Sequence, residues 1–144
     1  MNLGEDLYRE VILDHISQPR NRGPLECASH KHEGLNPVCG DQVEILLDIQ
    51  GDTVAQARFQ GTGCSISQAS ASMLAEQIQG LSVSAARDLA EHFKTFMKSR
   101  ESEPPDGLGD LEALAGVRKY PVRIKCALLA WTTLLQALEE TPNE

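Results

Sequence analysis

The sequence predicts an α+β fold in which a small antiparallel sheet packs against several helices. The first observation is a stretch over residues 43–59 that alternates apolar and polar residues, with the hairpin turn signal Gly51-Asp52 in its middle. The second is that the segments before and after it carry apolar residues at helical spacing and end at glycine or proline. A chain of 144 residues has the length of one domain, so we expect residues 1–144 to form a single domain.

The segment before the hairpin is expected to contain one helix and one short strand. A helix is predicted over Leu3–Ile16, because apolar residues recur near one face and Pro19 follows its end. Residues 20–35 are rich in turn-forming residues and leave room for a short strand near Cys27–His32. With the hairpin, this strand would give a three-stranded sheet.

The register of the hairpin is predicted from its apolar faces. A two-residue loop would place Arg58 opposite Ile45, which sets a charge against an apolar residue. A three-residue loop over residues 50–52 instead places Phe59 opposite Val43, so that the apolar faces match. We therefore expect the three-residue loop, because a slip of one residue would turn a whole face outward.

The segments after the hairpin are expected to be mainly helical. Helices are predicted over Ser65–Gln79 before Gly80, over Val83–Arg100, briefly around Leu108–Leu114 before Gly116, and from Pro121 past Trp131. Residues 101–107 form a loop by composition. The first half of the helix over residues 65–79 consists almost entirely of small residues, which favours close packing against a neighbour.

The open end of the hairpin is expected to bring together two thiols and a carboxylate. The predicted register, extended, places Cys39 opposite Gly63 and Asp41 opposite Gly61, and Cys64 follows directly. Opposed residues on paired strands lie about 5 Å apart, and residues two apart on a strand point to the same side. The two thiols and the carboxylate can therefore converge on one ion.

A third thiol, Cys126, lies near the start of the last helix and would complete this site. Thiolates grouped with a carboxylate are typical ligands of a metal such as zinc. Any one of these cysteines alone could equally be a small buried hydrophobic residue, since free cysteine packs well in cores. That alternative does not explain Asp41 on a core strand. The remaining cysteine, Cys27, has no adjacent glycine or ligand, and we interpret it as a structural thiol outside the site.

Two local features would stabilise thiolates in this chain. Cys64 lies at the N-terminus of a predicted helix, where unpaired N–H groups and the helix dipole favour negative charge. Cys126 follows a basic cluster, defined here as Arg118, Lys119, Arg123 and Lys125. This cluster either tunes the thiolate, or binds a partner, or is simply a solvated surface.

Composition excludes several classes of partner. The formal net charge is −8, which argues against nucleic acid, because phosphate binding needs a basic face. No apolar run has the length of a membrane span, and the acidic N-terminus lacks the order of a signal peptide. We therefore expect a cytoplasmic protein. Four cysteines in a reducing compartment indicate metal or thiol chemistry rather than disulfides.

Three segments of the chain resemble the three motifs of the IscU/NifU/SufU proteins, which take part in iron–sulfur cluster assembly. They are Asn36-Pro37-Val38-Cys39-Gly40-Asp41, Phe59-Gln60-Gly61-Thr62-Gly63-Cys64-Ser65-Ile66-Ser67 and Val122-Arg123-Ile124-Lys125-Cys126-Ala127-Leu128-Leu129-Ala130-Trp131. The chain resembles the SufU branch in particular, because Lys125 stands where IscU proteins carry a histidine, and residues 99–114 look like the SufU insertion. The resemblance implies a SufE/NifU-like fold with a three-stranded sheet and about four to six helices.

The resemblance also implies a function and a ligand set. Zinc would be bound by Cys39, Asp41, Cys64 and Cys126. The protein would take persulfide sulfur from a SufS-type cysteine desulfurase and pass it to a downstream cluster scaffold or apo-protein. It would act as a sulfur carrier for the desulfurase rather than as an autonomous enzyme. Cys126 is the candidate acceptor, because it lies on a different element from the hairpin and has basic neighbours.

Two other functions remain open at this point. In the first, the chain is a scaffold on which a transient [2Fe–2S] or [4Fe–4S] cluster is assembled on Cys39, Cys64 and Cys126. In the second, it is a purely structural zinc domain in which the metal serves only folding.

Overall fold

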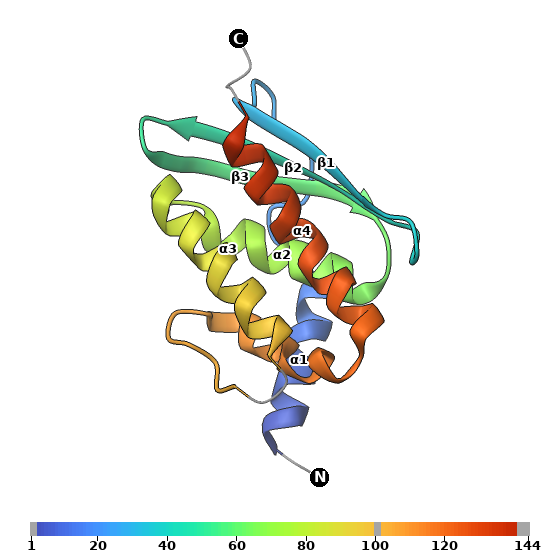
Figure 1. The fold of residues 1–144 in the computed structure, drawn as a ribbon. Helices are drawn as coiled ribbons and strands as arrows, with labels where there is room; N and C mark the ends of the chain where they lie inside the picture. The colour runs from blue at the N-terminus through green and yellow to red at the C-terminus, as the bar shows by residue number, and fades with distance from the viewer. Residues whose placement is uncertain (1–2, 100–101, 141–144) are drawn as a thin grey trace.

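The computed structural model describes residues 3–99 and 102–140, and in this part of the chain it has the α+β architecture that the sequence predicts (Figure 1). The elements are α1 (Leu3–Ser17), β1 (His30–Asn36), β2 (Asp41–Gln50), β3 (Thr53–Thr62), α2 (Ser65–Ile78), α3 (Val83–Lys98), the 3₁₀ segment η1 (Gly109–Lys119) and α4 (Pro121–Glu139). The sheet is antiparallel with the order β1-β2-β3. Helices α2 and α4 pack on one face of it, α3 packs on α4, and α1 and η1 lie at the end of the molecule away from the sheet. None of the helices described has the length and apolarity that crossing a bilayer requires.

The hairpin register differs from the prediction. The turn is the two-residue Gly51-Asp52, with Gln50 opposite Thr53, and Phe59 lies opposite Ile45 rather than Val43. The left-handed backbone of Gly51 (φ +61°) suits such a tight turn. A bulge after Val54 adds one residue to β3, which restores the apolar alternation that a two-residue turn alone would have broken. The three-residue loop was therefore wrong. Ala57 and Phe59 still face the core, but on the turn side of the bulge Val54 is buried while Thr53 is exposed.

The third strand lies later than expected, over His30–Asn36 instead of Cys27–His32. Cys27 is exposed on the preceding loop. The inward positions of β1 include His30, Gly34 and Asn36, so no apolar alternation marks the strand. A Cβ on Gly34 would lie 2.0 Å from Thr133 Oγ1, which shows how closely β1 approaches α4.

Small residues on α2 allow α4 to pack closely against it. The Trp131 indole N–H donates to Ser70 Oγ at 3.1 Å, and Ser70 Oγ donates to the Ala127 carbonyl at 2.6 Å. The Trp131 ring also contacts Phe93, with 5.3 Å between ring centroids. These buried contacts hold α4 against α2, and so bring two distant cysteine-bearing segments together.

A buried histidine joins α1 to α2 and η1. His15 Nδ1 lies 2.7 Å from Ser72 Oγ, and His15 Nε2 lies 2.8 Å from Asp110 Oδ2. The segment η1 continues to Lys119 and does not stop at Gly116 as predicted, whereas α3 ends at Lys98. Residues 100 and 101, which belong to the predicted end of α3 and to the predicted insertion, lie outside the described residues.

We expect His15→Ala to destabilise the protein by about 2–3 kcal/mol, because it leaves a cavity and removes a hydrogen bond from the buried Ser72 hydroxyl. Chemical denaturation with matched m-values would measure this loss. His92→Ala is the control, since His92 is exposed on α3. Equal unfolding free energies for the two variants would show that the His15 contacts do not stabilise the fold.

Candidate metal centre

Three of the four predicted ligands meet at one end of the sheet. Cys39 lies in the turn between β1 and β2, Asp41 is the first residue of β2, and Cys126 lies in the second turn of α4. Their ligand atoms all lie within 4.8 Å of one another. The two sulfur atoms of Cys39 and Cys126 are 3.4 Å apart. Residues 87 positions apart in the chain therefore present a thiol pair and a carboxylate to one point.

Cys64 lies beside this group but is not part of it. Its sulfur is 4.0 Å from Asp41 Oδ2, and its backbone N–H donates to Asp41 Oδ1 at 2.8 Å. The thiol also caps α2, accepting from the Ser67 N–H at 3.5 Å. Asp41 thus contacts the fourth predicted ligand with both of its oxygens.

Glycine is required where β3 approaches Asp41. The observed register pairs Gln42 with Thr62, so Asp41 faces Gly63 and not Gly61 as predicted. A Cβ on Gly63 would lie 2.5 Å from Asp41 Oδ1, and one on Gly61 would lie 2.1 Å from the Gln42 carbonyl oxygen. Gly63 thus leaves the space in which the carboxylate sits, and Gly61 allows β3 to lie close to the backbone of β2.

The thiols of the centre differ in burial, which affects how easily each can lose its proton. Cys126 is buried, and burial raises the pKa of its thiol above the ordinary value, with its contacts to Asp41 and Cys39 acting in the same direction. Cys39 is only partly buried. Crowded thiols next to a carboxylate are costly to ionise without a compensating cation, and sulfur and oxygen donors suit zinc. The donor set therefore fits the metal that the sequence predicts.

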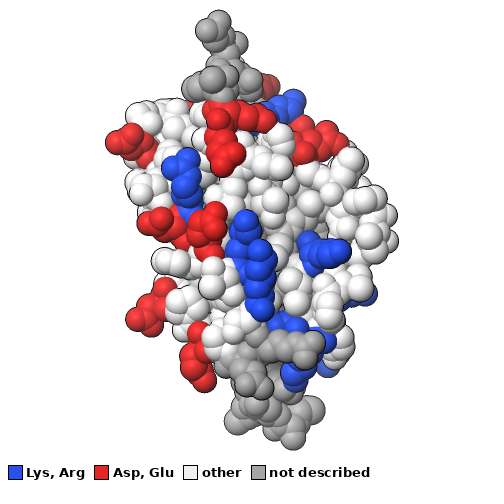
Figure 2. Space-filling model, in the orientation of Figure 1, with Lys and Arg blue, Asp and Glu red and all other residues white. Residues whose placement is uncertain are grey.

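The basic cluster divides into two parts in the structure. Arg118 donates to the carbonyls of Ser99 (2.9 Å) and Ser102 (3.0 Å), and its guanidinium lies 4.1 Å from the centre of the Phe96 ring. The other members of the cluster, Lys119, Arg123 and Lys125, are exposed. Figure 2 shows Lys and Arg side chains gathered over the middle and lower part of one face, with Asp and Glu mainly along its left side and top.

Asn36 was not assigned a role from the sequence, whereas Arg123 was predicted only as one member of the basic cluster. The pKa of Arg123 is raised above its ordinary value, first by the negative charge of Cys64 and to a smaller extent by that of Cys126. Asn36 is buried at the end of β1, with Nδ2 3.9 Å from Cys126 Sγ. The signal that the sequence offered for Asn36 was its position three residues before Cys39.

Exposed apolar side chains surround the segments that carry Cys39 and Cys126. Leu35 and Val38 precede Cys39 in the chain, and Tyr120 and Val122 precede Cys126. All four are more than half exposed, with Val38 the most exposed at 71%. We call these four residues the apolar rim. Exposed apolar groups beside a reactive centre are typical of a protein-binding surface.

Several known proteins are similar to this chain in sequence. Residues 7–139 match the family described as the NifU-like N-terminal domain. The chain is 45% identical over 130 residues to the zinc-dependent sulfurtransferase SufU of Bacillus subtilis, covering 90% of this chain and 88% of that protein. It is 37% identical to the iron–sulfur cluster assembly scaffold protein IscU of Thermotoga maritima, covering 93% and 94% of the two chains.

The fold is also similar to that of solved structures. The crystal structure of a putative iron–sulfur cluster assembly scaffold protein for the SUF system, from Fervidobacterium islandicum, superposes with a TM-score of 0.84 at 34% identity. The match covers 90% of this chain and 95% of that one.

Proposed function

Because the chain belongs to the family of NifU-like N-terminal domains, which act in iron–sulfur cluster assembly, we propose that it accepts sulfur from a cysteine desulfurase at a zinc-binding thiol centre. The observation that carries this proposal is the convergence of Cys39, Asp41 and Cys126, with Cys64 in contact with the same carboxylate. The 45% identity to a zinc-dependent sulfurtransferase supports the sulfur-accepting role over a purely scaffolding one.

The zinc ligands in this proposal are Cys39, Asp41, Cys64 and Cys126. When bound, zinc keeps the thiols deprotonated and protects them from oxidation. Cys27 is not a ligand, since its side chain is exposed on the loop before β1. All four cysteines are free thiols, which agrees with the reducing cytoplasm in which we place the protein.

Exposure favours Cys39 over Cys126 as the sulfur acceptor. The sequence favours Cys126 as the acceptor. In the structure, however, the Cys126 side chain is buried, and burial raises the pKa of its thiol. Cys39 is partly exposed in a turn beside Gly40, whose φ of +72° marks a tight bend, and beside the exposed Val38. A partner can reach this turn without opening the core.

The transfer step is an exchange of the same kind as thiol–disulfide exchange, in which one thiolate attacks and another leaves. The Cys39 thiolate attacks the outer sulfur of the persulfide on the desulfurase cysteine, and a new sulfur–sulfur bond forms on Cys39. The sulfur–sulfur bond of the donor breaks, and the desulfurase cysteine leaves as a thiolate. The apolar rim would provide the contact surface for a SufS-type desulfurase. The persulfide would then pass to a downstream scaffold or apo-protein.

The scaffold function is the second candidate. It is favoured by the 37% identity to a scaffold IscU over nearly the whole chain. A transient cluster on Cys39, Cys64 and Cys126 would be held by three thiolates, and so less tightly than by four. The position of Lys125, exposed on α4 before Cys126, supports the SufU-like interpretation, because IscU proteins resembling this chain carry a histidine there.

Colour, metal content and desulfurase stimulation, measured on one purified sample, distinguish the three candidate functions. We expect the purified protein to be colourless, to contain zinc, and to accelerate cysteine turnover by a SufS-type desulfurase. Cys27→Ser is the matched control and should retain both properties. A brown protein with charge-transfer absorbance and no desulfurase stimulation would favour the scaffold. A zinc protein that unfolds on chelation and does not stimulate the desulfurase would favour the purely structural domain.

We further propose that residues 1–144 form one domain with residues 99–114 as a branch-specific insertion within it. The family match over residues 7–139 supports a single domain. Contacts from Arg118 to Ser99 and Ser102, and from Asp110 to His15, tie the described part of this segment to the rest of the fold.

Charge reversal at Lys119 or Lys125 should slow desulfurase association severalfold at low salt. Steering by exposed charges fades as the Debye length falls from about 10 Å at 0.1 M salt to about 3 Å at 1 M. Lys119→Glu and Lys125→Glu should therefore approach the parent rate in stopped-flow measurements at 1 M salt. Arg118 is unsuitable for this test because it is a structural contact. Arg87→Glu, exposed on α3, is the control; an equal slowing by this variant would indicate a net-charge effect only.

A further inference from the structure

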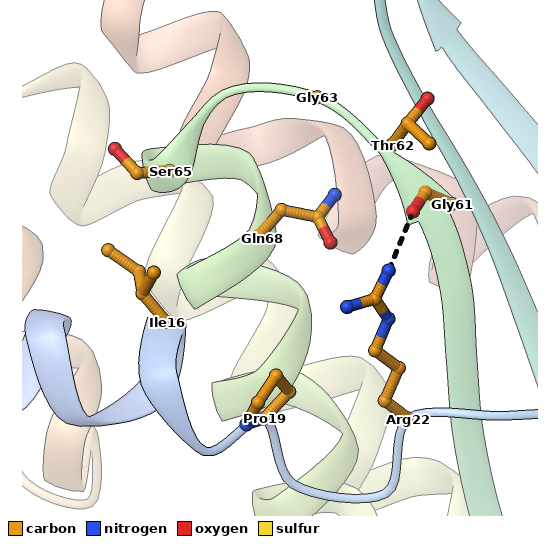
Figure 3. A pocket seen from close by; sticks show the side chains of 8 residues that line it. All are labelled: Ile16, Pro19, Arg22, Gly61, Thr62, Gly63, Ser65 and Gln68. Carbon is orange, nitrogen blue, oxygen red and sulfur yellow. Dashed lines mark hydrogen bonds between the residues drawn. The ribbon is translucent and has the colours of Figure 1, made fainter.

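A pocket of about 430 Å³ lies beside the metal centre but contains none of its proposed ligands (Figure 3). It opens between the end of α1, the loop that carries Arg22, and the segment where β3 passes into α2. Its volume falls within the range of small-ligand sites. Neither the proposed sulfur transfer nor the zinc ligand set accounts for it.

The polar side chains that line this pocket are hydrogen-bond donors, and no carboxylate is part of the lining. Arg22, Thr62, Ser65 and Gln68 line it, and no described aspartate or glutamate does, although the chain has 21 acidic residues. Arg22 Nη2 donates to the Gly61 carbonyl at 3.4 Å, and Arg22 forms no ion pair with the side chains described, those of residues 8–99 and 102–140. The guanidinium therefore has further donors to offer.

Gln68 presents an unsatisfied donor at the same place. Its Nε2 is buried and has no hydrogen-bond partner in the part of the chain that is described. Figure 3 shows its carboxamide directed toward the space between Thr62 and Arg22. Leaving a buried N–H unpaired is costly, so an acceptor entering the pocket would relieve that cost. Two donors from different elements thus face one space.

The rest of the lining is apolar. Ile16, at the end of α1, and Pro19, just after it, form the side of the pocket away from β3. The side chains of Ile16 and Pro19 can pack against a few methylene groups of a ligand but offer it no hydrogen bonds. We propose that the pocket binds a carboxylate on a short aliphatic stem, with the carboxylate oxygens accepting hydrogen bonds from Arg22 and Gln68 and the stem lying against Ile16 and Pro19.

A carboxylate of this kind comes either from a free small acid or from a glutamate side chain of a bound protein. Glutarate is the probe for the first source, and a blocked tripeptide with a central glutamate is the probe for the second. Glutaramide, which has the same stem without charge, is the ligand control. The full-length, metal-loaded protein is titrated with each, and the shifts of the Gln68 side-chain amide signals are followed by NMR.

We expect glutarate to shift the Gln68 amide signals saturably and glutaramide to leave them in place. Arg22→Gln should weaken glutarate binding about tenfold, because a hydrogen-bonded charge pair is lost. Arg87→Gln is the control, because Arg87 is exposed on α3, and it should leave the affinity unchanged. Binding of the tripeptide as well would identify a protein side chain as a sufficient source, and binding of glutarate alone would identify a free acid.

Gln68→Leu separates ligand binding from a structural role. We expect this variant to bind glutarate several times more weakly while its melting temperature stays equal or rises, because an unpaired buried donor is removed. A lower melting temperature with unchanged glutarate affinity would overturn the assignment of Gln68. Equal binding of glutarate and glutaramide, or no binding of glutarate, would overturn the proposal. None of these results depends on sulfur transfer, so the proposed function would stand or fall separately.

Discussion

Cys39→Ser should reduce persulfide acceptance from the desulfurase to background, while the unmodified protein should carry the transferred sulfur on Cys39. The reason is access. Cys39 lies partly exposed in the turn before β2, whereas Cys126 is buried in α4. Even as a zinc-bound thiolate, a buried sulfur is harder for a partner's persulfide to reach than a partly exposed one.

Peptide mapping can locate the sulfur without any mutation. Lysine and arginine positions place each cysteine in its own tryptic peptide, at residues 23–31, 32–58, 59–87 and 126–144. After one exposure to persulfidated desulfurase and alkylation, we expect the added sulfur in the peptide 32–58. Cys27→Ser controls for loss of a thiol in general and should accept sulfur normally. Sulfur in the peptide 126–144 would restore Cys126 as the acceptor.

Gly63→Ala should weaken zinc binding by about 10–100-fold without unfolding the protein. The new methyl group would lie 2.5 Å from Asp41 Oδ1, closer than any real contact allows, so the carboxylate must move. Displacing a ligand or the group that orients it typically costs metal affinity on this scale. The sheet and α2 should persist, because the contact is confined to the last residues of the hairpin.

Competition with a chromophoric chelator measures this affinity, and circular dichroism checks the fold. Gly23→Ala is the matched control, since Gly23 also has positive φ (+138°) but no described atom lies within 4 Å of the place that its new methyl group would take. Backbone strain alone would affect both variants. If Gly63→Ala binds zinc as tightly as Gly23→Ala, Asp41 is not a ligand whose position matters.

The sequence predicts the existence of the hairpin better than its register. Gly51-Asp52 marks the turn, and the alternation marks both strands. The bulge after Val54 has no residue type that signals it, so the pairing could not be counted correctly across it. The strand β1 was misplaced for a related reason: its inward residues are polar or glycine, and it is held by α4 rather than by an apolar face of its own.

In the candidate site, too, the features that depend on neighbouring residues could be predicted, and those that depend on helix packing could not. The convergence of Cys39 and Asp41 follows from strand geometry, because it depends on residues near a single turn. The burial of Cys126 depends on how α4 packs on α2 through Trp131 and Ser70, which no local pattern reveals. Arg118 likewise is continuous with Lys119 in the sequence, but its guanidinium turns back onto Phe96 and away from the rest of the cluster.

The hydrogen bond between the Cys64 backbone N–H and Asp41 Oδ1 has a consequence for metal uptake. The carboxylate is already anchored to the first turn of α2 by the fold, so it loses little rotational freedom when an ion arrives. Preorganisation of this kind lowers the entropic cost of coordination. Substitutions that only loosen the junction of β3 with α2 should therefore lower metal affinity through conformational entropy, even where every ligand is retained.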